Sequence, residues 1–153
     1  FFYTSPDLNG LQISASYGLD STSDYNGDTA KDDRQVAMTY TVNDNLTLAA
    51  ATTSGEDARQ DRTGYGMRYT KDAITATLST QESDAGNEWI NAYASYALND
   101  ADTVSAHISD TNSTNPFTLG YSHKYNDSLT VFAEYYDDDA GGERPQVGIH
   151  YNF

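Results

Sequence analysis

Residues 35–42 have the sequence Gln35-Val36-Ala37-Met38-Thr39-Tyr40-Thr41-Val42, in which an apolar side chain occupies every second position. The apolar members are Val36, Met38, Tyr40 and Val42, and the positions between them carry only Gln, Ala and Thr. Successive side chains of a β-strand point to opposite faces of its sheet, so this period of two predicts a strand with one apolar face. No stretch of the chain shows the period and capping residues of a helix, and we therefore expect an all-β protein.

The same alternation recurs along the chain in segments of about eight to ten residues, separated by clusters of Gly, Asn and Asp. Ten strands are expected between Leu11 and Phe153. The apolar faces of the other nine lie within residues 11–19, 46–53, 65–70, 74–79, 90–98, 104–108, 117–125, 129–135 and 147–153. Residues 1–4 are expected to end an eleventh strand. Single-chain bacterial barrels have an even number of strands, so this odd count predicts that amino-terminal strands precede the sequence.

The second face of the expected strands decides where the protein resides. It is rich in Thr, Ser, Ala, Gly and Gln, with few of the Lys and Glu residues that favour a freely solvated exterior. An apolar face turned to lipid, around a lumen lined by small polar residues, accounts for both faces. We therefore expect a transmembrane antiparallel up-and-down β-barrel, with residues 1–153 as a single domain. A soluble β-sandwich remains the alternative, and it predicts extraction without detergent.

The connections between the expected strands alternate in length. Short turns are expected at Asn43-Asp44, Lys71-Asp72, residues 99–102 and Asn126-Asp127, and longer polar loops at residues 20–34, 54–61, 82–87, 111–116 and 137–145. In outer-membrane barrels the short turns are periplasmic and the long loops extracellular. This pattern places the carboxy terminus in the periplasm.

Tyrosines recur once per expected hairpin. Tyr40, Tyr69, Tyr96, Tyr125 and Tyr151 are separated by 29, 27, 29 and 26 residues, each near the strand end that leads to a short turn. Amphipathic aromatic rings favour the boundary between membrane and water. We interpret these tyrosines, together with Phe153, as a periplasmic aromatic girdle. The alternative is that Tyr is simply a good strand former.

Composition excludes several classes of function. The chain carries 8 basic and 23 acidic residues, for a net charge of −15, and lacks the Lys and Arg clusters that nucleic-acid binding requires. It has no Cys, which excludes disulfide scaffolds, thiolate zinc sites and thiol nucleophiles. No catalytic motif is present, and we expect no enzymatic activity. An outer-membrane protease would need an Asp–His pair at the extracellular rim, whereas His107 and His150 are expected on the wall and His123 on the outward face.

Alternation also selects candidates for the pore lining. The side chains expected to point into the lumen are Arg68, Trp89, Asn91, Tyr93, His107, Phe132, Glu134 and His150. A few charges of both signs on a pore wall set a field that orients and filters ions. The alternative for each residue is a hydrated side chain without a specific role.

Acidic loops offer the last feature. Oxygen ligands for Ca²⁺ are present at Asp24, Asn26 and Asp28, and again at Asp137, Asp138 and Asp139, but neither run matches a full calcium-binding loop. Such runs are usually solvated, and no other cofactor is expected. A mouth with net negative charge concentrates cations, so we expect a mild cation preference.

Both ends of the chain resemble a known family. Residues 147–153, Val147-Gly148-Ile149-His150-Tyr151-Asn152-Phe153, resemble the closing strand of Gram-negative porins, and residues 1–17 resemble the hairpin that follows the constriction loop in general diffusion porins, closest to the alphaproteobacterial type. The resemblance implies a sixteen-stranded homotrimeric barrel in the outer membrane, in contact with the lipid bilayer and lipopolysaccharide, of which this chain forms roughly strands six to sixteen. The first strands and the constriction loop are absent from the sequence.

The main hypothesis is therefore the carboxy-terminal part of a porin, a channel for passive diffusion of ions and small hydrophilic solutes. The alternative is a small complete barrel with a plugged lumen that acts as a structural or adhesive surface protein. Small Thr, Ser and Ala residues on the inner face favour the open channel.

Overall fold

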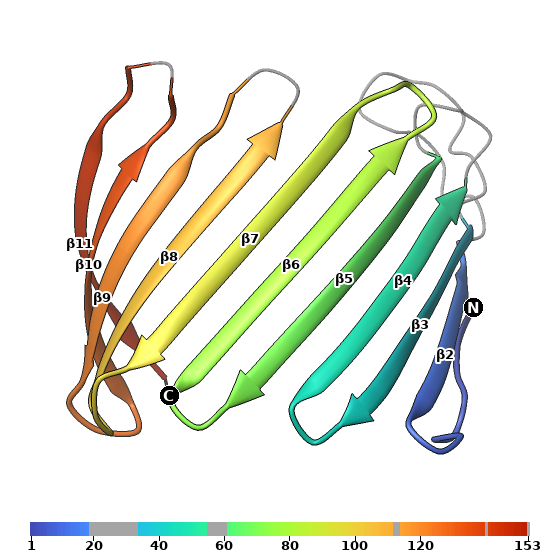
Figure 1. The fold of residues 1–153 in the computed structure, drawn as a ribbon, viewed down its shortest axis with the longest axis horizontal. Helices are drawn as coiled ribbons and strands as arrows, with labels where there is room; N and C mark the ends of the chain where they lie inside the picture. The colour runs from blue at the N-terminus through green and yellow to red at the C-terminus, as the bar shows by residue number, and fades with distance from the viewer. Residues whose placement is uncertain (19–33, 55–60, 112–113, 140, 153) are drawn as a thin grey trace. The chain divides into compact units, whose positions relative to one another are not determined.

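The computed structural model describes residues 1–18, 34–54, 61–111, 114–139 and 141–152. It contains eleven strands in one antiparallel sheet whose strand order follows the chain (Figure 1). The strands are β1 (Phe2–Thr4), β2 (Leu11–Tyr17), β3 (Arg34–Asn43), β4 (Leu46–Ser54), β5 (Arg62–Lys71), β6 (Ile74–Ser83), β7 (Glu88–Ala97), β8 (Asp102–Thr111), β9 (Phe117–Lys124), β10 (Leu129–Asp137) and β11 (Arg144–Tyr151). The all-β, up-and-down architecture expected from the alternation is confirmed. Within these residues no helix is long and apolar enough to cross a membrane.

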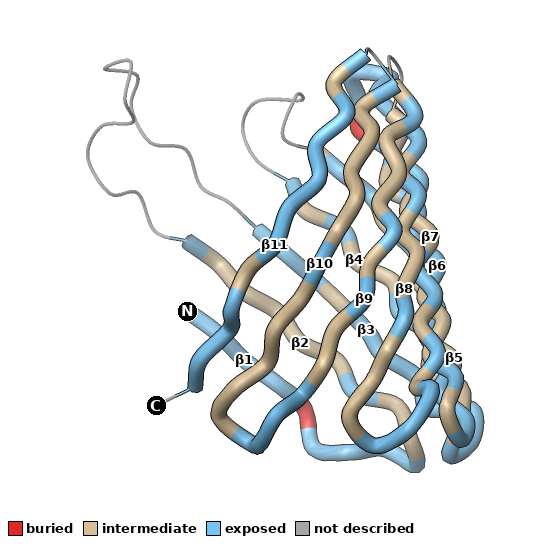
Figure 2. The backbone as a smooth tube through the Cα atoms, turned by 90° about the vertical axis from the view of Figure 1, so that its left-hand side faces the viewer, coloured by how far each residue is buried: buried red, intermediate tan, exposed pale blue. Residues whose placement is uncertain are grey.

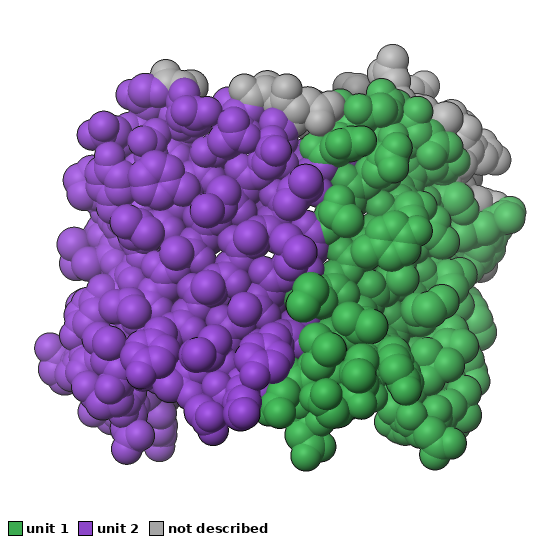
Figure 3. All heavy atoms as spheres, viewed as in Figure 1, with its two compact units in different colours: residues 1–67, 80–88 green, residues 68–79, 89–153 purple. Residues whose placement is uncertain are grey.

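The chain divides into two compact units (Figure 3). The first comprises residues 1–67 and 80–88, and in it Ile13 of β2 lies opposite Met38 of β3, which lies opposite Ala50 of β4. The second comprises residues 68–79 and 89–153 and holds the consecutive pairs from β7 to β11. The prediction that residues 1–153 form a single domain stays a prediction.

Neither unit has a hydrophobic core within the described residues. The buried positions are Ser5 and Ser83, both polar, and the tube in Figure 2 is otherwise exposed or intermediate where it is described. Large apolar side chains are instead uncovered, with Ile108 57% and Val147 79% exposed. Burial of such side chains is the main force that stabilises a water-soluble fold. The apolar face of this sheet therefore lacks a covering layer of protein in the described structure.

Three of the short turns use the same local device. Asn43, Asn99 and Asn126 each begin a turn, and each side-chain oxygen accepts hydrogen bonds from the backbone N–H groups two and three residues later, at 2.8 to 3.0 Å. The Asn side chain thus supplies an acceptor that the backbone of the reversing chain lacks. These three short turns, expected from the sequence, are confirmed.

One expected long loop is much shorter than predicted. Strand β6 continues to Ser83 and β7 begins at Glu88, so only residues 84–87 connect them. The Ser83 N–H donates to the Asn87 carbonyl oxygen at 2.9 Å, and the Gly86 N–H donates to the Ser83 carbonyl at 2.8 Å. Gly86 has a φ of 79°, which glycine adopts without strain. The prediction of a long loop at residues 82–87 is wrong because this hydrogen-bonded turn closes it.

Candidate channel wall and membrane-facing surface

The register of the second unit places polar and aromatic side chains in rows that cross the strands. One row consists of Tyr93, His107, Thr118, Tyr136 and Arg144, on β7 to β11 in order. The next rows toward the short turns are Ser95, Ser105, Gly120, Glu134 and Gln146, then Ala97, Thr103, Ser122, Phe132 and Gly148, then Lys124, Thr130 and His150. Residues that face each other across a ladder share a face, so these rows define one polar face.

Seven of the eight candidates for the pore lining lie on this polar face of β7 to β11. Tyr93, His107, Phe132, Glu134 and His150 belong to the rows above. Asn91 pairs with Ser109, whose Oγ lies 2.8 Å from the Asn91 Oδ1, and Trp89 pairs with Thr111. The register therefore brings these seven side chains to a common face, although not to a single cluster.

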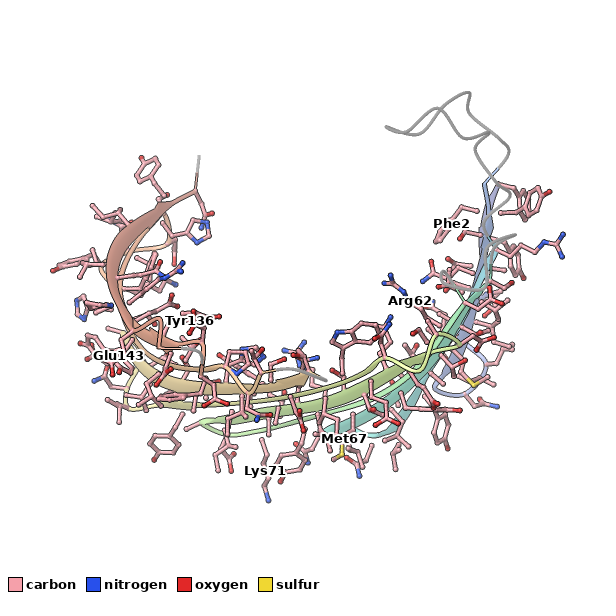
Figure 4. All side chains as sticks on the ribbon, turned by 90° about the horizontal axis from the view of Figure 1, so that it is seen from above. Phe2, Arg62, Met67, Lys71, Tyr136 and Glu143 are labelled. Carbon is pink, nitrogen blue, oxygen red and sulfur yellow. The ribbon has the colours of Figure 1, made fainter. Side chains whose placement is uncertain are left out.

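Arg68, the eighth candidate, lies on β5. Figure 4 shows Arg62 projecting to one side of this strand, and Met67 and Lys71 projecting to the other. Arg68 follows Met67 and has the same parity as Arg62, so strand geometry places it on the polar face of β5.

The polar face of β7 to β11 holds three further residues that sequence reasoning missed, namely Lys124, Tyr136 and Arg144, and Arg62 lies on the polar face of β5. Arg144 was expected within a loop, but β11 begins at this residue, opposite Tyr136. The alternation, continued past Pro145 to the strand end, was the signal available for it. Among described strand residues, the polar face of β5 carries Arg62 and Arg68, and that of β7 to β11 carries the basic residues Lys124 and Arg144 and the acidic residue Glu134.

Lys124 is also tied to the turn that follows it. Its Nζ donates to the Asp127 Oδ1 at 2.8 Å. This hydrogen bond and the positive charge of Lys124 lower the pKa of the Asp127 carboxyl from its ordinary value of 3.8. Both groups are strongly exposed, so the pair contributes little to stability.

Glycines give bulky side chains of this face room to lie along the sheet. A methyl group added at Gly120 would lie 2.6 Å from the Ser105 Oγ and 3.8 Å from the Glu134 Cγ. A methyl group at Gly148 would overlap the ring of Phe132. Side chains that lie flat against the sheet leave the space above it free for water.

The opposite face is apolar and ends in aromatic residues. Four of the tyrosines interpreted as a girdle are exposed, with Tyr40 at 46% and Tyr125 at 64%, whereas Tyr69 is half-buried. Tyr40, Tyr69, Tyr96 and Tyr151 lie in the part of β3, β5, β7 and β11 nearest the short turns or the carboxy terminus, and Tyr125 directly follows β9. Phe153 lies outside the described residues. The role of the set as a membrane girdle stays a prediction.

A second aromatic group, which sequence reasoning missed, lies at strand ends that lead to the other connections. In the first unit the Arg34 guanidinium lies 5.7 Å from the centre of the Tyr17 ring. In the second unit the rings of Phe117 and Tyr135 are 5.9 Å apart. Outer-membrane barrels carry aromatic residues at both membrane boundaries, so two such groups fit that architecture.

A polar cluster interrupts the apolar face at the short-turn end of β8 and β9. The Asp102 Oδ1 accepts a hydrogen bond from the Tyr121 hydroxyl at 2.5 Å and lies 2.7 Å from the His123 Nδ1. The Asp102 Oδ2 accepts from the Asn99 side-chain amide at 2.7 Å. His123 pairs with Asp102 in the ladder and shares the face of Val104, as alternation predicted for its outward orientation.

The calcium hypothesis concerns two acidic runs. Asp24, Asn26 and Asp28 lie outside the described residues. Asp137 and Asp138 use carboxylate oxygens to accept the backbone N–H groups of Asp139 and Gly142, at 2.9 and 2.8 Å. In the described part of the chain, no three Asp, Glu, His or Cys side chains gather closely enough to hold a metal ion. Calcium binding stays a prediction.

Comparison with known proteins gives the same architecture. The model of the Gram-negative porin family matches residues 1–143. A variant of the porin of Rhodopseudomonas blastica superimposes with a TM-score of 0.79 at 25% identity, and so does a triple mutant of that porin. Each match covers 99% of this chain and 54% of the porin, so the chain spans about half the length of these solved structures. No curated protein matches the sequence.

These findings confirm the resemblance seen at the two ends of the sequence. The eleven strands correspond to part of a porin barrel, and the family consists of channel proteins of the bacterial outer membrane. The chain belongs to the Gram-negative porin family.

Proposed function

We propose that this chain forms part of the wall of a water-filled channel, through which ions and small hydrophilic solutes cross the outer membrane by passive diffusion. The polar face of β7 to β11 lines the channel, and the apolar face contacts lipid. No enzymatic step, cofactor or energy source is required, because the protein only provides a wet path through hydrocarbon.

The observation that supports this proposal is that one face of the sheet is apolar and exposed, whereas the other face is polar. Large apolar side chains such as Ile108 and Val147 are exposed without a covering layer in the described structure, as a lipid-facing surface requires. Half of the residues in the rows of the other face are Ser, Thr, Ala or Gly, and the other half are charged, aromatic, His or Gln residues. Phe132 lies flat over Gly148, so this large side chain leaves the lumen open rather than plugging it.

Two opposing sets of charges determine ion selectivity in this proposal. The polar faces of β5 and of β7 to β11 together carry four basic residues and Glu134, which leaves 4 of the 8 basic and 22 of the 23 acidic residues elsewhere in the chain. The acidic excess concentrates at the turns and strand connections, where it attracts cations to the channel mouths. We propose a mild cation preference, since the acidic residues at the turns and connections outnumber the basic residues on the channel wall.

The family relationship supports the remaining parts of the proposal. The complete protein is a sixteen-stranded homotrimer with its carboxy terminus in the periplasm, and lipopolysaccharide surrounds it on the side of the longer connections. The aromatic residues at the two ends of the apolar face support a membrane-spanning sheet, because they match two membrane boundaries.

Planar-bilayer recording on the full-length protein, extracted in detergent, tests the channel function. A salt gradient across the bilayer gives the reversal potential, and therefore the sign of the ion preference. Stepwise openings in groups of three, with a cation-selective reversal potential, are expected.

Two results would contradict the proposal. A silent bilayer, with folding and insertion verified by heat-modifiable gel mobility, would overturn the open channel in favour of a plugged structural barrel. Openings with an anion-selective reversal potential would support the open channel but contradict the proposal that the acidic residues determine its ion preference.

A further inference from the structure

We propose that the apolar face of β9 to β11, at its short-turn end, binds one glycerophospholipid that carries a primary ammonium in its headgroup. The headgroup contacts the cluster of Asp102, Tyr121 and His123, and part of an acyl chain occupies the hollow beside it. The inference rests on the proposed function, because it requires this face to contact the bilayer.

The polar cluster is unusual for its position. A charged carboxylate on the lipid-facing side of a barrel is destabilising unless it lies near the membrane boundary and is paired. Asp102 is the first residue of β8, directly after a short turn, and its side chain is 22% exposed. The cluster thus lies where lipid headgroups are found, rather than at the depth of the acyl chains.

The carboxylate of Asp102 retains capacity to accept another hydrogen bond. Its Oδ1 lies near both Tyr121 and His123, whereas among the described residues its Oδ2 accepts from the Asn99 amide alone. A carboxylate has about four acceptor positions, so a donor from a ligand can approach the Oδ2. The His123 side chain is 35% exposed and its Nδ1 lies 2.7 Å from the Asp102 Oδ1, so in the imidazolium form, in which both ring nitrogens are donors, its Nε2–H can donate to a ligand phosphate.

A hollow of about 320 Å³ lies directly beside this cluster. It is lined by Tyr121, His123 and Tyr125 on one side, Val131 and Ala133 along its floor, and Val147 on the other side. In the register, Ala133 stands between Tyr121 of β9 and Val147 of β11, and its small side chain leaves the depression between two larger neighbours. An apolar floor with polar groups at one end matches an acyl chain and its headgroup.

Charge complementarity selects the headgroup. The Asp102 carboxylate and the protonated His123 imidazolium lie side by side, so they match a zwitterion whose ammonium meets Asp102 and whose phosphate meets His123. Asp100 and Asp127 lie in the neighbouring short turns, where Lys124 pairs with Asp127. The local acidic excess disfavours a lipid with net negative charge, and a quaternary ammonium lacks the N–H donor that the Asp102 Oδ2 can accept.

Native mass spectrometry of the full-length protein tests the site. The protein is exchanged into mild detergent with equimolar phosphatidylethanolamine, phosphatidylcholine and phosphatidylglycerol of identical acyl chains. We expect retention of one phosphatidylethanolamine per protomer in preference to both other lipids. Equal retention of the three lipids, or preference for phosphatidylglycerol, would overturn the assignment.

Two pairs of variants separate the headgroup contact from the hollow. Asp102→Asn removes the charge and is matched by Asp110→Asn at the far end of β8, on the same face. Ala133→Phe fills the hollow and is matched by Ala92→Phe on the apolar face of β7. We expect each site variant to lower phosphatidylethanolamine retention about tenfold, as for the loss of one charge-assisted contact, and each control to leave it unchanged. Unchanged phosphatidylethanolamine retention in Ala133→Phe would refute the proposal that the hollow holds an acyl chain. This result would stand even if Asp102→Asn disturbed folding.

Bilayer conductance of the same preparations distinguishes this inference from the channel function. A protein that conducts but shows no lipid preference would refute the lipid site and leave the channel intact. A protein that retains phosphatidylethanolamine but never conducts would refute the channel and keep the site.

Discussion

The ring of Phe132 lies directly over Gly148, its partner on the neighbouring strand. A methyl group added at Gly148 would meet the Phe132 Cε1 at 2.8 Å and Cε2 at 3.0 Å. Atoms without a covalent bond do not approach this closely, so the flat orientation of Phe132 requires glycine at position 148. The pair keeps a large aromatic side chain close to the sheet on the face that we assign to the channel.

We expect Gly148→Ala to tilt the Phe132 ring away from the sheet and narrow the channel. Single-channel conductance should fall, and overpacking should destabilise the protein by about 1–3 kcal/mol. The double variant Gly148→Ala with Phe132→Ala should restore conductance, because the displaced ring is then absent. A double variant with the same low conductance would show that Phe132 does not mediate the effect.

Neutralising a basic residue of the polar face should strengthen the cation preference. Arg144→Gln removes a positive charge opposite Tyr136, and Glu134→Gln removes the negative charge from the adjacent row. We expect the reversal potential to move toward cation selectivity in Arg144→Gln and away from it in Glu134→Gln. Shifts of the same sign in both variants would contradict a role for wall charges.

Ionic strength should also change the selectivity. The Debye length falls from about 30 Å at 0.01 M salt to about 3 Å at 1 M, so charges at the mouths act on the whole channel only in dilute salt. We expect the cation preference to weaken as salt is raised. High salt screens the acidic residues at the mouths, whereas the basic side chains of the wall still act on passing ions because they contact them directly. A preference that does not change between these concentrations would exclude the acidic mouths as its source.

A pair of adjacent residues can show which face contacts lipid. Ala92 and Asn91 are neighbours near the middle of β7, on its apolar and polar faces respectively. Arginine on the lipid side near the bilayer midplane costs about 2–4 kcal/mol, so Ala92→Arg should lower the free energy of unfolding in lipid vesicles by that order. Asn91→Arg should have a much smaller effect. Equal losses in a urea titration of both variants would contradict the assignment of the faces.

The Asn turns predict a local effect on stability. Asn126→Ala removes an oxygen that accepts the N–H groups of Ser128 and Leu129, and each such hydrogen bond contributes about 0.5–1.5 kcal/mol. We expect a lower urea midpoint for Asn126→Ala. Ser128→Ala is the control, because it keeps the backbone N–H that contacts Asn126, and its midpoint should match that of the parent protein.

Alternation along single strands was sufficient to predict the elements and their two faces. Residues 35–42 alternate so regularly that the period of two specifies both the strand and the orientation of Met38 and Tyr40. The short turns could be predicted for the same reason, since Asn43, Asn99 and Asn126 act on backbone groups within three residues of themselves.

Features that depend on pairing between strands could not be predicted in this way. Arg144 follows Gly141, Gly142 and Glu143, a composition typical of a loop, yet the ladder with β10 extends to it. Likewise, the contact between Asp102 and His123 depends on the register of β8 against β9, which joins residues 21 positions apart. Local sequence carries no signal for the contact between Asp102 and His123, and for Arg144 the available signal was the alternation continued past Pro145.

The strand order β1 to β11, which follows the chain without a crossover, has a consequence for assembly. Every ladder joins consecutive strands, so each hairpin can pair with the exposed edge strand of the neighbouring hairpin. Such local pairing closes small loops and is entropically inexpensive compared with folds that join distant segments. Assembly of this sheet can therefore proceed as serial addition of hairpins to a free edge, in which a damaged hairpin stalls the addition of the strands beyond it.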